Sequence, residues 1–218
     1  IATARGASKL MYTGMEYSGN GVQNIRAALT LWALAGQLDV PGGLCFTMDA
    51  NAFPINRDAL VKNPVANPRL GRDRFPLYIH YRDEAHAITL PESVLKGIPY
   101  KIRALIVQGS SIITSWPDPG LWKKTLKALD FMVCVDRQLT ADAAYADIVL
   151  PASTHYEITS YMTYGSMFRV RERMVEPRGE SRGDTMIMAE LARRLGYGHL
   201  YPQSEEEALR HVLKNSGF

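Results

Sequence analysis

Several features that would assign the chain to common functional classes are missing. No run of about 18 apolar residues occurs, so the sequence predicts no transmembrane helix. Two cysteines, Cys45 and Cys134, lie far apart and form no CxxC pair, so we expect no iron–sulfur or zinc cluster made by this chain. None of the five histidines lies at the spacing of metal ligands from another histidine or a cysteine. A net charge of +3 over 218 residues is too diffuse to indicate nucleic-acid binding.

Motifs of nucleophilic catalysis and simple nucleotide binding are missing as well. The chain has no GxSxG elbow joining a strand to a helix and no phosphate-loop lysine, and its one approach to GxGxxG has Asn24 in place of the third glycine. Asp142 and Asp147 flank a short alanine-rich turn and are interpreted as cap and turn residues rather than an acid/base pair. We therefore predict no catalytic residue in this chain.

What the sequence does contain is a regular alternation of strands and helices over residues 101–151. Apolar runs at 104–107, 131–135 and 148–150 are short and rich in β-branched residues, as expected of strands buried on both faces. Asp118 and Pro119 predict a helix start between the first two runs, and Thr140 can cap a short turn at 141–146. This order predicts an α/β fold, a Rossmann-like three-layer sandwich with a mostly parallel sheet.

Polar residues follow the first two predicted strands. Gly109, Ser110 and Ser111 come after the first, while Asp136 ends the second and Thr140 lies four residues further on. Ligands of open parallel sheets bind outside the carboxyl ends of the strands. The glycine–serine turn offers N–H and hydroxyl groups to a phosphate, and Asp136 can accept from ribose hydroxyls or a purine amino group. Ordinary turns use the same residue types, so that interpretation stays open.

The remaining segments predict one α/β region over residues 1–218. Residues 9–13 suggest a short strand that leads through the glycine-rich turn 14–21 into a helix capped by Asn20 and ended by Gly36. A long irregular excursion follows at 39–75, then a short strand or an extended lead-in at 75–80 and a short helix at 91–95. A loop-rich extension covers 152–183, and helices cover 184–218, with Asp184 and Ser204 as expected caps.

The order of several motifs resembles a known family. The run ADIVLPASTHYE follows VDRQLT, is preceded by ALIVQGSSIITSWPD, and is followed by VEPRGESRGD and AELARRLGY. Together with GMEYSGNGVQNIRAALTLWALAGQLDVPGG, these runs resemble the molybdopterin oxidoreductases of the dimethyl sulfoxide reductase class. The resemblance extends from about Thr13 to Tyr197.

The resemblance implies a molybdenum or tungsten cofactor held by two molybdopterin guanine dinucleotides, the bis-MGD cofactor. Matching motifs carry over a set of cofactor-binding residues. By this resemblance, Thr13, Gly14 and Tyr17 lie near the pterin and pyrophosphate, and Gly109, Ser110 and Ser111 lie over the guanosine. Asp136 and Thr140 bind guanine or ribose, and Asp184 lies near the cofactor. Glu157-Ile158-Thr159-Ser160 departs from the family's Glu-Lys-Glu-Gly, which leaves the subfamily open.

The resemblance also implies partners outside this chain. In the family, the metal ligand, any iron–sulfur cluster and a C-terminal β-rich domain lie elsewhere, so the chain is expected to be a middle fragment that is inactive alone. Its expected partners are the remaining domains of the enzyme and an iron–sulfur electron-transfer subunit, as in enzymes of anaerobic respiration. The alternatives are a non-catalytic Rossmann-like nucleotide-binding module and part of a non-redox metal–pterin hydratase.

Overall fold

The structure, a computed structural model, describes residues 1–45, 53–55, 69–82, 84–214 and 216. The chain divides into two compact units. The smaller contains Ile1–Phe53 and Thr163–Met167, and the larger contains Pro54–Met162 and Phe168–Phe218. The expected excursion at 39–75 lies largely outside the described residues, and the single region over 1–218 stays a prediction.

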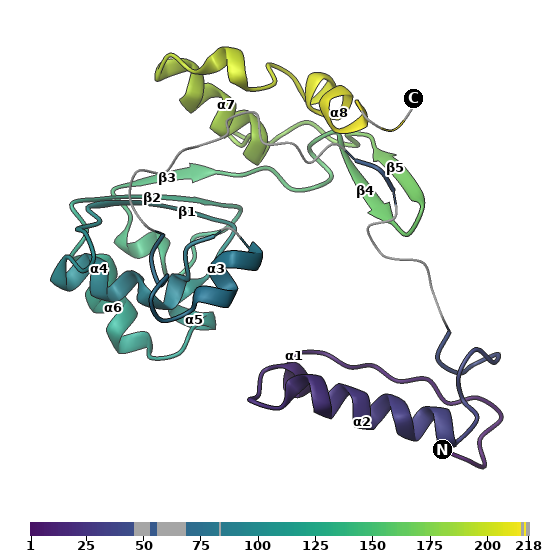
Figure 1. The fold of residues 1–218 in the computed structure, drawn as a ribbon. Coiled ribbons are helices and arrows are strands. Elements are labelled where there is room, and N and C mark those ends of the chain that lie inside the picture. Colours follow the sequence, from purple (N-terminus) through teal and green to yellow (C-terminus); the bar gives the residue numbers. More distant parts are fainter. Residues whose placement is uncertain (46–52, 56–68, 83, 215, 217–218) are drawn as a thin grey trace. The chain divides into compact units, whose positions relative to one another are not determined.

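A parallel sheet forms the centre of the larger unit, as the sequence predicts (Figure 1). Its strands are β1 (Ala104–Gln108), β2 (Phe131–Asp136) and β3 (Ile148–Pro151), in the order β1-β2-β3. Each begins and ends within one residue of the predicted run. Parallel neighbours need crossover connections, and these bring all three carboxyl ends to one edge of the sheet.

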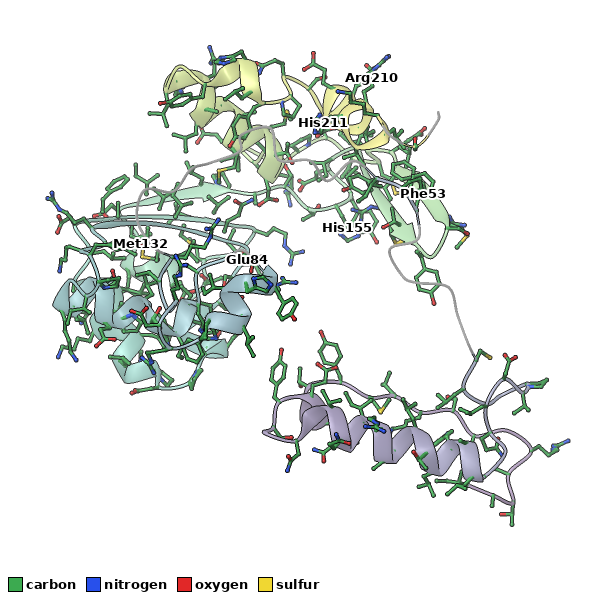
Figure 2. The ribbon with its side chains drawn as sticks, viewed as in Figure 1. Phe53, Glu84, Met132, His155, Arg210 and His211 are labelled. Carbon is green, nitrogen blue, oxygen red and sulfur yellow. The ribbon has the colours of Figure 1, made fainter. Side chains whose placement is uncertain are left out.

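Helices cover one face of this sheet (Figure 1). They are α3 (Pro76–Arg82), α4 (Leu90–Lys96), α5 (Ile112–Ser115) and α6 (Pro119–Lys127), with a 3₁₀ turn, η1, at Ala87–Thr89. The α6 start is as predicted, because the Asp118 carboxylate accepts from the Leu121 N–H at 3.0 Å and Pro119 is the first helical residue. Trp122 is fully buried and belongs to the same core cluster as Met132, which is labelled in Figure 2.

The opposite face of the sheet is partly open, so the prediction of strands buried on both faces is wrong for Ile106, Phe131 and Ile148, although Val135 on that face is fully buried. Val107 and Met132 are buried, whereas the outward-facing Ile106, Phe131 and Ile148 are 46%, 43% and 45% exposed. Successive strand residues point to opposite faces, and the helices α3 to α6 lie against only one of them. The other face lacks a comparable cover among the described residues.

The rest of the larger unit follows β3. A two-stranded sheet contains β4 (Ser160–Tyr164) and β5 (Met167–Arg171), and the hairpin tip belongs to the smaller unit. Two helices follow, α7 (Asp184–Arg194) and α8 (Glu205–Leu213), with a 3₁₀ turn, η3, at Gly198–Leu200 between them. The Ser204 cap is confirmed, since its hydroxyl accepts from the Glu207 N–H at 3.1 Å.

The smaller unit contains α1 (Thr13–Glu16) and α2 (Gly21–Leu34). The strand predicted at 9–13 is wrong, because this segment pairs with no strand among the described residues and runs directly into α1. Gly21 permits the close approach of the two helices, since a Cβ there would lie 2.1 Å from the Glu16 carbonyl oxygen. Asn20 precedes α2 without a side-chain cap bond, and Gly36, at φ +66°, follows its end as predicted.

Two further sequence predictions about helices have clear outcomes. The short strand or extended lead-in predicted at 75–80 is wrong, because α3 begins at Pro76, a residue well suited to the first position of a helix. The helix predicted at 91–95 is confirmed by α4. Within the described parts of the chain, no helix has the length and apolarity needed to cross a membrane.

Candidate functional site

A pocket of about 270 Å³ lies at the carboxyl ends of β1 and β2. Its lining includes predicted site residues from both strand-end loops and from the start of α7. The full set is Gly109, Ser111, Val135, Asp136, Arg137, Gln138, Thr140, Ala152 and Asp184. Of the predicted site residues, Gly109, Ser111, Asp136, Thr140 and Asp184 therefore share one cavity, whereas Ser110 is not among its lining residues.

The turn after β1 forms the first wall of this pocket. Gly109 has a φ of +55°, a left-handed conformation that side chains rarely adopt, and its N–H donates to the Val135 carbonyl at 3.0 Å. This bond holds the turn against the end of β2. Ser111 lies between this turn and the start of α5, and it lines the pocket.

Asp136 forms the second wall and retains binding capacity. Its Oδ1 accepts from the Gln138 N–H at 3.2 Å, and its backbone carbonyl accepts from the Ala152 N–H at 3.1 Å. Its Oδ2 makes no hydrogen bond to any described residue. A half-buried carboxylate oxygen of this kind accepts from N–H or O–H donors of a ligand.

Thr140 connects the pocket to the buried sheet. Its hydroxyl accepts from the Ala143 N–H at 3.3 Å, as predicted for a cap of the turn at 141–146, although the residue that directly precedes η2 (Ala143–Tyr145) is Asp142. It also lies 4.0 Å from the Cys134 sulfur. Burial raises the pKa of the Cys134 thiol; the Thr140 hydrogen bond opposes this, and the carboxylates of Asp136 and Asp142 raise the pKa further.

Asp184 closes the pocket from the far side. Its Oδ1 accepts from the Gln108 Nε2 at 2.9 Å, which joins the start of α7 to the end of β1. Asp184 is the first residue of α7 and Gly183 is the cap, so the prediction that Asp184 caps the helix is wrong. The side chain bonds to Gln108, 76 residues away in sequence. Asp184 also borders a second pocket of about 420 Å³ with Tyr161 and Glu205.

Asp142 supports the pocket although the sequence marked it only as a cap or turn residue. It is fully buried, and its carboxylate accepts from the N–H groups of Ile112 and Ile113 at 2.5 and 2.9 Å. Asp142 therefore caps the start of α5, which follows the β1 strand-end loop, through its side chain. The sequence carries no signal for this, because the partners lie about 30 residues apart.

The remaining predicted residues lie in the smaller unit. Thr13 and Gly14 are in α1, and Tyr17 follows it with 82% of its surface exposed. The Tyr17 N–H donates to the Thr13 carbonyl at 2.9 Å, which closes this short turn. That these residues meet the same ligand as Asp136 stays a prediction. The described residues contain no group of three or more His, Cys, Asp or Glu suited to a metal ion.

Comparisons with known proteins agree with these motifs. The chain is 28% identical over 213 residues to the probable oxidoreductase YyaE of Bacillus subtilis, covering 95% of this chain and 30% of that protein. It is 36% identical over 129 residues to the F420-dependent formate dehydrogenase subunit alpha of Methanocaldococcus jannaschii, covering 58% of this chain and 19% of that protein. The chain thus spans about a third or less of these relatives.

A solved structure has the same fold. Acetylene hydratase from Pelobacter acetylenicus aligns with a TM-score of 0.74 at 20% identity, covering 100% of this chain and 34% of that chain. The family model described as molybdopterin oxidoreductase matches residues 8–194, which is most of the sequence. The chain therefore belongs to the molybdopterin oxidoreductase family.

Proposed function

We propose that this chain is the cofactor-binding portion of a molybdenum or tungsten oxidoreductase and holds the guanosine end of a bis-MGD cofactor. The observation that carries the proposal is the strand-end pocket, in which Gly109, Ser111, Asp136, Thr140 and Asp184 come together. The whole enzyme would transfer oxygen atoms or electrons at a metal whose ligand lies outside this chain.

The chemistry of the pocket fits a guanosine. Guanine presents an N1–H and an amino group as donors on one edge, and ribose adds two hydroxyl donors. The free Oδ2 of Asp136 is an acceptor for such donors, and Thr140 and Ser111 add hydroxyl groups. The position at the carboxyl edge of a parallel sheet is the usual one for a nucleotide.

The chain's own contribution is binding and orientation. When bound, the cofactor supplies the metal redox chemistry, while the protein sets its position and surroundings. Gly109 and Asp184 hold the walls of the pocket through their bonds to Val135 and Gln108. The expected partners are the remaining domains of the enzyme and an iron–sulfur electron-transfer subunit, which agrees with the greater length of the relatives.

The test is made in the full-length enzyme with Asp136→Ala. Molybdenum or tungsten per protein should fall, together with the GMP that acid hydrolysis releases from a guanine dinucleotide cofactor. Asp130→Asn is the matched control, because Asp130 is an exposed carboxylate at the opposite end of β2, paired with Arg103. Unchanged metal and GMP content in Asp136→Ala would contradict the proposal.

A second measurement on the same enzyme distinguishes this function from that of a general nucleotide-binding module. Calorimetry of the cofactor-free enzyme should show binding of guanosine and GMP in preference to adenosine and NAD. Asp136 is an acceptor and matches the donor edge of guanine. A preference for adenine compounds would therefore favour the nucleotide-binding module.

A further inference from the structure

A second pocket lies between β4, the start of α7 and α8, within the larger unit (Figure 1). Its volume of about 420 Å³ falls in the range of small-molecule sites, which is about 300–1,000 Å³. Most of its lining is apolar, with Ile158, Met186, Leu209 and Val212 among the large side chains. This α7–α8 pocket shares only Asp184 with the strand-end pocket, so the two are separate sites.

A missing side chain at Gly183 keeps the α7–α8 pocket open. Gly183 has φ −60° and ψ 140°, an extended conformation that any residue adopts, so the backbone does not require glycine there. A Cβ atom at this position would lie 3.2 Å from Ile158 Cγ2 and 3.8 Å from Glu205 Oε1, and both residues line the pocket. The glycine therefore leaves space between an apolar side chain and a carboxylate, where a ligand can lie.

Two carboxylates face this pocket, and each has one oxygen to spare. Glu205 Oε2 accepts from the Thr159 N–H at 2.8 Å, and Asp184 Oδ1 accepts from Gln108 Nε2 at 2.9 Å. The second oxygen of each makes no hydrogen bond to any described residue. The described lining contains one histidine, His211, labelled in Figure 2, and neither lysine nor arginine. The pocket therefore offers acceptors for a cation without a basic side chain that would compete for them.

Aromatic rings complete the lining. Tyr161 stacks on Phe168 with ring centroids 5.3 Å apart and planes 12° from parallel, which holds the Tyr161 ring in place. Tyr201 lines the pocket from the segment before α8. The faces of such rings attract cations, and the apolar side chains accommodate hydrocarbon. Together these groups match a ligand that has an apolar body and a positively charged end.

We propose that the α7–α8 pocket binds a small organic ammonium compound. The protonated amine pairs with the spare oxygens of Glu205 and Asp184, and the apolar body lies against Tyr161 in the space beside Gly183. The inference does not rest on the proposed function, because it needs no guanosine and no metal. Asp184 borders both pockets, so the test uses Glu205 and Gly183 instead.

The test measures the binding of benzylamine and of benzyl alcohol to the full-length enzyme by calorimetry at neutral pH. The two compounds have nearly the same shape, and only the amine is charged, so it should bind about tenfold more tightly. Glu205→Gln keeps an oxygen for the Thr159 N–H and removes the charge. It should weaken benzylamine by about tenfold and leave benzyl alcohol unchanged.

Glu206→Gln is the matched control. Glu206 lies in the same first turn of α8, but it pairs with Arg210 and does not line the pocket, so both affinities should stay unchanged. Gly183→Ala places a methyl group in the open space and should weaken the amine and the alcohol alike.

The outcomes separate a binding role from a structural one. If Glu205→Gln weakens both compounds by the same factor, Glu205 only holds β4 to α8, and the inference is overturned. Equal affinity of the unmodified enzyme for the amine and the alcohol, or no binding of benzylamine, overturns it as well. This comparison on the unmodified enzyme decides alone if the variants do not fold. Guanosine binding, measured on cofactor-free enzyme, reports on the proposed function independently.

Discussion

Replacement of Asp136 by asparagine is the sharpest test of how the pocket reads its ligand. Asparagine keeps one side-chain oxygen, which can still accept from the Gln138 N–H that Asp136 Oδ1 bonds at 3.2 Å. The second oxygen, free in the wild type, becomes an NH₂ group. That group presents a donor to the donor edge of guanine, so an attraction becomes a clash of like partners.

The magnitude follows from the exposure of this carboxylate. A hydrogen bond to a charged group contributes about 1.5–3 kcal/mol, and Asp136 is half-buried, which places it near the lower value. We therefore expect guanosine binding to weaken by about tenfold to thirtyfold, at about 1.4 kcal/mol per factor of ten. Inosine lacks the 2-amino group, so the wild type should bind it about tenfold more weakly than guanosine, and Asp136→Asn should lose this difference.

Calorimetry of the cofactor-free full-length enzyme measures these affinities directly. 2′-Deoxyguanosine is the control ligand, since it retains the whole base and lacks one ribose donor. If Asp136→Asn weakens guanosine and inosine equally while abolishing the preference for ribose over deoxyribose, Asp136 reads the sugar. The base-reading argument would then be refuted.

Three further predictions concern stability. Asp118→Ala should lower the free energy of unfolding by about 2 kcal/mol, because it removes the hydrogen bond from the Leu121 N–H and places alanine at φ +60°. Asp118→Gly should lower it by only a few tenths of a kcal/mol. Urea titration measures both. Trp122→Ala should cost about 3–5 kcal/mol in the same titration. Hydrogen bonds from backbone N–H groups, that of Thr154 first, lower the pKa of Glu157 below its ordinary 4.5. The loss of stability in Glu157→Gln should therefore be largest at neutral pH and should vanish as the pH falls through the folded-state pKa. Amide exchange measures this loss, and a loss that grows in acid would contradict the prediction.

The central sheet and its first helix were accessible from sequence because their signals are local. Short runs of β-branched residues locate β1 to β3, and the Asp118-Pro119 pair marks the start of α6. The rule that ligands of parallel sheets bind at the carboxyl ends of the strands then indicated the loops that line the strand-end pocket. Spacing and one general rule were sufficient to locate these strands and their carboxyl-end loops.

The errors arise where distant partners decide the outcome. The segments 9–13 and 75–80 are short and apolar, and such runs suit a strand only if another strand is available to pair with them. Asp184 bonds to Gln108 rather than capping its own helix. The role of Asp142 likewise depends on N–H groups that approach only after folding.

The uncovered face of the central sheet affects how this polypeptide segment behaves when it is produced alone. Ile106, Phe131 and Ile148 leave an apolar strip in contact with water, and large strips of this kind promote association between molecules. Recombinant material of this length is therefore expected to aggregate or to need a carrier. Burial of the strip against another surface would add to the folding free energy.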